Sequence, residues 1–360
     1  MDNYTIQFPN YTIGKNALQK IQVICQPYGK KAVLIGGHTA LEKVRHKIDE
    51  ALQTSQIELL DEIWYGGECS ETHVKRITEE IKMKKIDFIL GVGGGRALDT
   101  AKAVADRLNI PIFTVPTIAA TCAATTKLSV VYNEQGVFET FYFYDRPPIH
   151  VFIDTEIISQ APIEYLRAGI GDTLAKYYEC TFASRGRNLE HNSGLAVAMS
   201  KMCAEPLLQY GLKAIQDCKG NHTSFEVEQV ILANIVTTGL VSMLIEEDYN
   251  GAVAHSVFYG LTTLPHIEEK YLHGDVVGYG VLVQLMMDGQ EGEMQKLYHF
   301  YKSIGIPTSL KEIEVECIDE VLLPVIENIL VQPDMEVVPY KMTGQMILDS
   351  MKKLEQLGGQ

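Results

Sequence analysis

The sequence lacks several features that would place a protein outside the cytosol. None of its apolar stretches reaches the length of a transmembrane helix, and the first residues, MDNYTIQFPNYTIG, have neither the basic segment nor the apolar core of a signal peptide. The seven cysteines follow no regular spacing and include no Cys-x-x-Cys pair, which indicates reduced thiols rather than a disulfide framework. We therefore expect a cytoplasmic protein with no membrane partner.

Basic residues are also scarce relative to acidic ones. Lysine and arginine total 31 against 46 aspartates and glutamates, and the resulting net charge of −15 argues against nucleic acid as a partner. A chain of 360 residues with 46% hydrophobic residues is long enough to bury a large core and to form two domains. With nucleic acid and membrane excluded, we expect the partner to be a small molecule.

The order of strand-like and helix-like segments divides the chain in two. Short β-branched runs alternate with helical patterns in the first part, which predicts a parallel sheet with helices on both faces. The expected strands are residues 31–37, 57–64, 88–91 and 112–116. After about Asp154 the pattern is helical, at 163–184, 188–212, 224–245, 250–261 and 274–288. We expect a Rossmann-like α/β nucleotide-binding domain over residues 1–155 and an all-α domain over residues 156–360.

A cluster of glycines follows one of the predicted strands. Gly91, Gly93, Gly94 and Gly95 lie between the apolar run IDFIL and the amphipathic helical pattern RALDTAKAVADRL. Glycines at a helix N-terminus leave backbone N–H groups open to a phosphate, and the helix dipole favours the anion. The spacing is not the G-x-G-x-x-G fingerprint, because Arg96 replaces the third glycine, and no G-K-[ST] of a P-loop follows. The cluster predicts a phosphate site, with a tight strand–helix turn as the alternative.

Three residues of the helical part form a candidate metal site. Asp172 lies in GIGDTLAKYYE, His255 in GAVAHSVFYGLT and His273 in YLHGDVVGYGVLVQL. One carboxylate and two imidazoles suit Zn²⁺, Fe²⁺ or a neighbouring divalent ion. Each residue also has a structural alternative: Asp172 as the N-cap at the start of its helix, His255 as a satisfied core histidine, and His273 as a cap residue in a turn.

These motifs, in this order, resemble the iron-containing (group III) alcohol dehydrogenases, in the branch that contains glycerol dehydrogenase and shares its architecture with dehydroquinate synthase. GVGGGRALDTAKAVAD is similar to the phosphate-binding turn of that family, and VPTIAATCAATTKLSVVYNEQG to its nicotinamide-side loop. GIGDTLAK is similar to the segment of the first metal ligand, and AHSVFYGLT and LHGDVVGYG to those of the two ligand histidines.

The resemblance implies hydride transfer between NAD(P) and a small alcohol or carbonyl compound, in a homo-oligomeric enzyme. It assigns Asp172, His255 and His273 to one divalent ion, with zinc expected first and iron or manganese as alternatives. It assigns the following residues to the cofactor: Gly37, Gly93, Gly94, Gly95, Arg96, Asp99, Thr117, Ala120, Thr126, Leu128 and Tyr132.

Three positions depart from the glycerol dehydrogenases. Cys122 replaces an aspartate that helps to bind the polyol, and Phe258 replaces a histidine, so the substrate pocket is expected to be less polar. The string TIAATCAA is closer to the hydroxycarboxylate dehydrogenase subgroup, which implies a 2-hydroxy acid/2-oxo acid pair, with glycerol as the alternative substrate. Gly37 stands where NAD-preferring relatives have an aspartate, which removes a charge that would repel a 2′-phosphate.

Two other functions are compatible with parts of the sequence. A 3-dehydroquinate synthase would need a cluster of basic residues near the metal, but the candidate ligands have only Lys176 and Lys270 as basic sequence neighbours. A degenerate relative that binds nucleotide or metal without catalysis is favoured by Cys122 and Phe258, and disfavoured by the three intact ligands.

Overall fold

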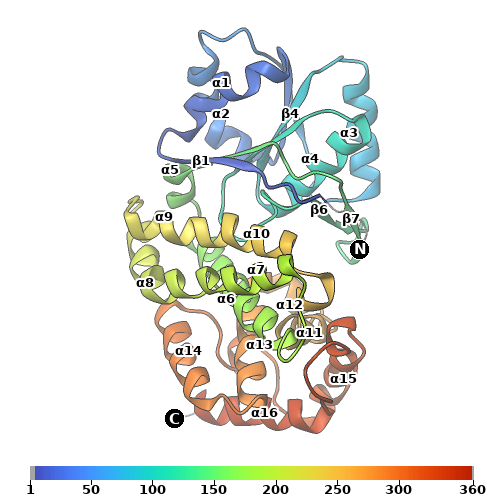
Figure 1. Cartoon of the computed structure of the whole chain (residues 1–360), viewed down its shortest axis with the longest axis vertical. Coiled ribbons are helices and arrows are strands. Elements are labelled where there is room, and N and C mark those ends of the chain that lie inside the picture. The colour runs from blue at the N-terminus through green and yellow to red at the C-terminus, as the bar shows by residue number, and fades with distance from the viewer. Residues whose placement is uncertain (1–4, 359–360) are drawn as a thin grey trace. The chain divides into compact units, whose positions relative to one another are not determined.

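A computed structural model describes residues 5–358, so the first four residues of the segment expected to lack a signal peptide lie outside it. The chain forms two compact units (Figure 1). One unit comprises residues 1–161 together with Asp217–Ile231, and the other comprises Pro162–Gln216 and Leu232–Gln360. The chain therefore passes between the units after residues 161, 216 and 231, where the sequence suggested a single boundary near 155.

The first unit contains the expected parallel sheet. Its strands are β1 (Asn10–Gly14), β2 (Lys31–Gly36), β3 (Glu58–Trp64), β4 (Phe88–Gly93), β5 (Ile112–Pro116) and β8 (His150–Asp154). All neighbouring pairs are parallel, in the order β1-β8-β5-β4-β2-β3. The prediction of a parallel α/β domain is confirmed, although β1 and β8 were not among the expected strands.

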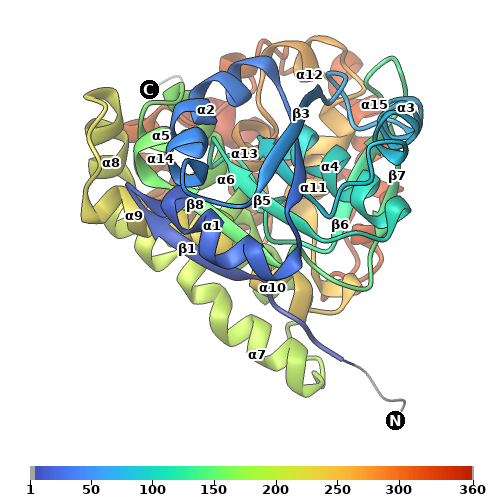
Figure 2. The same ribbon diagram turned by 90° about the horizontal axis from the view of Figure 1, so that it is seen from above.

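Helices cover both faces of this sheet (Figures 1 and 2). The helices α1 (Ile21–Cys25) and α2 (His38–Leu52) pack on one face, and α3 (Glu71–Lys82) and α4 (Gly95–Leu108) pack on the other. Consecutive strand residues point to opposite faces, so Leu34 belongs to the first core and Val33 to the second. The short helices α5 (Thr155–Ser159) and α9 (Phe225–Ile231) complete this unit.

The strand order creates a switch point between β2 and β4. The chain runs from β2 outward to β3 on one side, and from β4 to β5 on the other. In such sheets ligands bind beyond the carboxyl ends of the two strands that flank this point. Gly36 ends β2, and a Cβ at this residue would lie 2.5 Å from the carbonyl oxygen of Val92 in β4. The ends of β2 and β4, which both contain glycines expected to contact the cofactor, therefore lie side by side.

An antiparallel hairpin, β6 (Leu128–Tyr132) and β7 (Phe138–Phe143), was not predicted and changes the interpretation of α4. The sequence indicated an amphipathic helix, but every residue from Ala97 to Ala105 is buried. The helix α4 packs against the sheet and also against α3 and β6, so little of the surface of α4 reaches solvent. The polar residues Asp99, Thr100 and Lys102 are consequently buried as well.

The described residues of the second unit form helices and connecting loops and no β-strand, as predicted. Its helices are α6 (Ile163–Ala183), α7 (His191–Met199), α8 (Glu205–Lys219, which runs into the first unit), α10 (Thr238–Leu244), α11 (Val253–Leu261), α12 (His266–Lys270), α13 (His273–Met287), α14 (Glu291–Ile304), α15 (Asp319–Leu330) and α16 (Gly344–Gly358). The apolar helix α13 packs along both α6 and α11. These three helices carry the three candidate metal ligands.

One segment corrects the expectation that no apolar stretch is long enough to span a membrane. Residues Phe225–Leu244 form α9, a π-helical turn at Leu232–Thr237, and α10, with a mean hydropathy of 1.5 in their most apolar window. Glu226 and Glu228 interrupt the apolar run in the sequence, which is why it was not recognised. Of that window, 61% is buried inside the protein, as in the core helix of a soluble protein. The seven cysteines are all free thiols, as expected.

Candidate functional site

The three candidate metal ligands converge in the second unit. One ligand atom each from Asp172, His255 and His273 lies within 4.8 Å of the other two. Oδ1 of Asp172 is 3.4 Å from Nε2 of His273 and 3.7 Å from Nε2 of His255. Asp172 and the two histidines, which follow it by 83 and 101 positions in the sequence, therefore present an oxygen and two nitrogens to one point.

Two glycines adjacent to the ligands allow this convergence. A Cβ at Gly171, next to Asp172 on α6, would lie 2.1 Å from the carbonyl oxygen of Gly274 on α13. A Cβ at Gly274, next to His273, would lie 1.8 Å from the carbonyl oxygen of Ala168 on α6. Any side chain at either position would force the two helices apart. The glycines thus set the distance between Asp172 and His273.

The structure rejects the capping alternative for Asp172. The helix begins at Ile163 with Pro162 as its N-cap, so Asp172 lies in the middle of α6 rather than at its start. Mid-helix backbone N–H groups are already bonded within the helix, and the Asp172 carboxylate is free to face the histidines. His273 is the first residue of α13, following the N-cap Leu272.

A buried carboxylate, Glu179, holds His255 in place and was missed in the sequence. Its residue is 0% exposed, and Oε2 accepts a hydrogen bond of 2.5 Å from Nδ1 of His255. Its other oxygen accepts the backbone N–H groups of Ala252 and His255, both at 2.9 Å. The bond at Nδ1 leaves Nε2 directed at Asp172. The sequence does contain a signal for Glu179, because it follows Asp172 by seven residues and so lies on the same face of an otherwise apolar helix.

Charges in this cluster stabilise one another strongly. Burial alone would lower the pKa of His255, but the carboxylates of Glu179 and Asp172 outweigh it and raise the pKa to about 10. Burial would raise the pKa of Asp172, yet His255 and His273 hold it well below its usual range. The pKa of Glu179 is lowered as well, because His255 outweighs the effect of burial. Two ionised carboxylates therefore face one another across His255 and favour positive charge between them.

Phe258, which we expect to line the substrate pocket, packs against His273, one of the three candidate metal ligands. Its ring meets the His273 ring edge-on, with 4.4 Å between the centroids. Phe258 follows His255 by three residues on α11, so the two side chains project from neighbouring positions of one helix face. Phe258 therefore supports the orientation of His273 and makes that side of the site apolar.

In the first unit, the glycine cluster forms an open helix N-terminus. Gly93 has a φ of +139°, a conformation that side chains rarely adopt, and Gly94 is the N-cap of α4 with no side-chain cap. The first N–H groups of a helix have no partner within it, so those following Gly94 are available to a phosphate. The backbone N–H of Thr117, after β5, donates to the carbonyl of Gly93 and brings the next loop alongside.

Several other predicted cofactor residues lie around this turn. Arg96 forms an ion pair with Glu68, and its guanidinium lies over the Tyr132 ring at 5.5 Å from the centroid. Gly37, the N-cap of α2, has room for a side chain, because a Cβ there meets only the Tyr65 ring at 3.4 Å.

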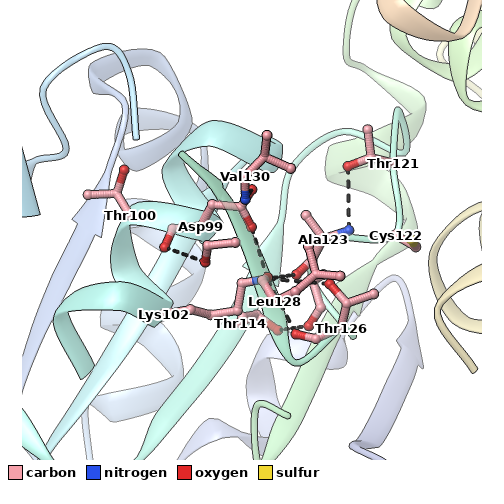
Figure 3. Close-up of polar contacts among 12 residues, drawn as sticks. Asp99, Thr100, Lys102, Thr114, Thr121, Cys122, Ala123, Thr126, Leu128 and Val130 are labelled. Carbon is pink, nitrogen blue, oxygen red and sulfur yellow. Dashed lines mark hydrogen bonds and ion pairs between the residues drawn. The ribbon is translucent and has the colours of Figure 1, made fainter. Parts of the chain in front are cut away.

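The remaining predicted cofactor residues belong to the loop after β5 or to the elements beside it. Thr117 is buried and Ala120 is half-buried in this loop, and Cys122 is partly exposed in it. Asp99, Thr126 and Leu128 instead meet at the buried side chain of Lys102, which the sequence analysis did not single out (Figure 3).

The sequence and the fold of the chain are both similar to those of known proteins. The sequence profile of iron-containing alcohol dehydrogenases matches residues 9–155. The chain is 37% identical to a glycerol dehydrogenase of Thermotoga maritima over 73% of its own length and 72% of the relative. It is 35% identical to hydroxycarboxylate dehydrogenase A of Escherichia coli over 90% of its length and 89% of the relative. The crystal structure of glycerol dehydrogenase from Schizosaccharomyces pombe superposes with a TM-score of 0.88 at 27% identity, covering 100% of this chain and 92% of that one.

The chain belongs to the iron-containing alcohol dehydrogenase family. It is accordingly an NAD(P)-dependent oxidoreductase that acts on CH–OH groups, as the resemblance implied.

Proposed function

We propose that the enzyme transfers a hydride between NAD(P) and a small 2-hydroxy acid/2-oxo acid pair, with the help of one divalent metal ion. The observation that carries the metal assignment is the convergence of Asp172, His255 and His273 within 4.8 Å, backed by the buried carboxylate of Glu179. Catalytic zinc sites have three protein ligands and leave the fourth coordination position to water or substrate, whereas structural zinc sites have four protein ligands. Zinc is the metal that we expect first.

Each group of the chain has a distinct task in this proposal. A metal ion held by the three ligands would act as a Lewis acid on the substrate oxygen, and the nicotinamide would exchange the hydride. Glu179 fixes the tautomer of His255 and thereby turns Nε2 toward Asp172, where it would be available to the ion. The N–H groups that follow Gly94 bind the pyrophosphate. Phe258 keeps water away from one side of His273.

The choice of a 2-oxo acid over glycerol rests on Cys122 and Phe258. Neither side chain pairs a polyol hydroxyl as well as the aspartate and histidine expected in glycerol dehydrogenases. Each unpaired polar group costs about 1–3 kcal/mol, which corresponds to about 5- to 150-fold in rate. The similarity to hydroxycarboxylate dehydrogenase A supports this choice, and that to glycerol dehydrogenases supports the alternative.

The substrate assignment is tested by comparing kcat/KM for reduction of 2-oxobutanoate and 2-oxoglutarate with kcat/KM for oxidation of glycerol. We expect at least about a tenfold advantage for a 2-oxo acid, and a shift toward glycerol in a Cys122→Asp, Phe258→His double variant. Equal efficiency on glycerol in the unmodified enzyme would contradict the assignment. Metal binding without turnover on any of these compounds would indicate a non-catalytic relative.

Replacing Glu179 by glutamine is expected to weaken zinc binding by about 10- to 100-fold, because supporting carboxylates orient ligand histidines and raise their basicity. Glutamine keeps the size of the side chain, and its amide oxygen can still accept both backbone N–H groups, but its NH₂ group cannot accept the hydrogen bond from Nδ1 of His255. Competition with a zinc chelator measures the effect directly, without relying on activity. Glu268→Gln, at an exposed position of α12, is the matched control. An affinity unchanged in Glu179→Gln would show that His255 needs no such support.

Replacing Gly37 by aspartate is expected to shift the cofactor preference from NADP(H) toward NAD(H). The N-cap position of α2 follows the end of β2, where a carboxylate binds the ribose 2′-hydroxyl and repels a 2′-phosphate. Since a Cβ there meets only the Tyr65 ring at 3.4 Å, the variant should fold normally. The ratio of kcat/KM for the two cofactors is the measurement, and the unmodified enzyme should accept NADP(H) at least as well as NAD(H). A strong preference of the unmodified enzyme for NAD(H) would refute the argument from Gly37.

A further inference from the structure

The loop between β5 and β6 has little regular structure of its own. Residues 117–127 contain neither helix nor strand, yet they carry several groups that we assign to the nicotinamide side of the cofactor. A loop of this kind needs partners for its buried backbone carbonyl groups, because unpaired ones are costly. The hydroxyl groups of Thr114 and Thr125 donate to the carbonyl oxygens of Ala124 and Cys122. Two further carbonyl groups of the loop are paired by one side chain of the neighbouring helix.

That side chain is Lys102 of α4, which is 2% exposed (Figure 3). Its ammonium group donates to the backbone carbonyl oxygens of Ala123 at 2.8 Å, of Thr126 at 3.3 Å and of Leu128. The hydroxyl of Thr126 lies at 3.4 Å. One cation thus gathers carbonyl groups from both the loop and the start of β6, much as a bound metal ion would.

The charge of Lys102 is balanced inside the same cluster. Oδ1 of Asp99, one turn earlier on α4, lies 2.9 Å from the ammonium nitrogen. The other oxygen of Asp99 accepts the backbone N–H of Val130 at 3.1 Å, and the Asp99 carbonyl accepts the Ser129 hydroxyl at 2.9 Å. The pair therefore holds β6 as well as the loop, and both side chains are almost completely buried.

The position of this pair on α4 links two parts of the proposed cofactor site. The N-terminus of α4 is the proposed pyrophosphate turn, and the middle of the same helix carries Asp99 and Lys102. A rigid helix therefore sets the distance from that turn to the loop. Cys122 lies in the same loop, and Figure 3 shows its side chain pointing away from the Lys102 cluster.

We propose that Lys102 is a positioning residue, whose ammonium group holds residues 117–128 in the shape that binds the nicotinamide side of the dinucleotide. This inference rests on the proposed dinucleotide site. Lys102 itself is too deeply buried to touch the cofactor, so it acts through the loop. Its role is that of a built-in cation, which a small free ammonium ion should be able to replace.

The test uses Lys102→Ala, with Lys84→Ala as the control because Lys84 lies in the same unit but forms its ion pair with Asp61 near the surface. In the protein without dinucleotide, we expect faster hydrogen exchange confined to residues 117–132 in Lys102→Ala. NADH should bind about tenfold more weakly or worse, because the loop must then be ordered on binding. Zinc affinity should not change, since its ligands belong to the other unit.

Methylammonium chloride should restore both the slow exchange and the NADH affinity of Lys102→Ala, whereas sodium chloride at the same ionic strength should not. If Lys102→Ala unfolds because the Asp99 carboxylate is left unpaired, the Asp99→Asn, Lys102→Met double variant removes both charges and should still show the loop-confined loss of protection. Normal protection of the loop in a folded variant, or equal effects of the two salts, would overturn the inference. Failure of the unmodified enzyme to bind NADH or NADPH would refute the dinucleotide site, while the exchange comparison would still decide the role of Lys102.

Discussion

Replacing His255 by alanine is expected to abolish zinc retention and to lower kcat/KM by about 1,000-fold or more. Lewis-acid stabilisation of a developing negative charge contributes several kcal/mol, and about 1.4 kcal/mol corresponds to a factor of ten in rate. The variant removes one of the ligand atoms that converge within 4.8 Å. Zinc content after dialysis and steady-state kinetics with added zinc measure the two effects separately.

The controls for this experiment follow from the surroundings of His255. The substitution leaves the Glu179 carboxylate buried without its imidazole partner, and such a group is strongly destabilising. A His255→Ala, Glu179→Gln double variant removes that problem, and His273→Ala removes a ligand that is more exposed. His299→Ala, at an exposed position of α14, should leave metal and activity unchanged. Full activity of a zinc-free His273→Ala variant would disprove the metal site.

Replacing Gly274 by alanine is expected to destabilise the helical unit by about 3 kcal/mol, near the upper end of the usual cost of overpacking. A Cβ at this position would lie 1.8 Å from the carbonyl oxygen of Ala168, and backbone atoms of a packed helix cannot move aside as a flexible side chain can. For a domain of this size the change corresponds to a fall of roughly 6–12 °C in Tm. Because α13 must shift away from α6, zinc affinity should fall as well.

A second glycine of the same unit provides the control. Gly194 lies within α7, and a Cβ there would meet nothing within 4 Å. Alanine at this position should therefore keep zinc affinity and should raise stability by up to about 1 kcal/mol, since alanine is the better helix former. Thermal unfolding followed by circular dichroism compares the two variants. Equal Tm values for Gly274→Ala and the unmodified enzyme would mean that the close approach of α6 and α13 is not needed.

The features that could be predicted from the sequence are those that depend on local patterns. The glycine run after Leu90 and the β-branched strands identified the parallel sheet and the turn before α4. The spacing of apolar residues predicted α6, α11 and α13 of the second unit, whereas α14, α15 and α16 were not among the expected helices. The ligand residues Asp172, His255 and His273 were identified from the family motifs around them, and the structure brings their side chains together.

The features that could not be predicted depend on contacts between distant segments. Glu179 and Lys102 are charged residues on helices, and a sequence pattern places such residues at the surface by default. Their burial follows from the elements that pack over them: α11 over Glu179, and β6 with its preceding loop over Lys102. The edge strand β1 was missed for a similar reason, because its pairing with β8 joins residues separated by about 140 positions.

The return of residues 217–231 to the first unit has a consequence for synthesis on the ribosome. The helix α9 packs against α5 in this unit, although residues 162–216, which separate them in the sequence, belong to the other unit. Domains usually fold one after another as the chain emerges, beginning at the N-terminus. Here the nascent sheet domain stays incomplete until Ile231 has left the exit tunnel, by which time α6 and α7 have already emerged. A fragment that stops at residue 161 would permanently lack α9, so the two units are products of one shared folding process rather than independent modules.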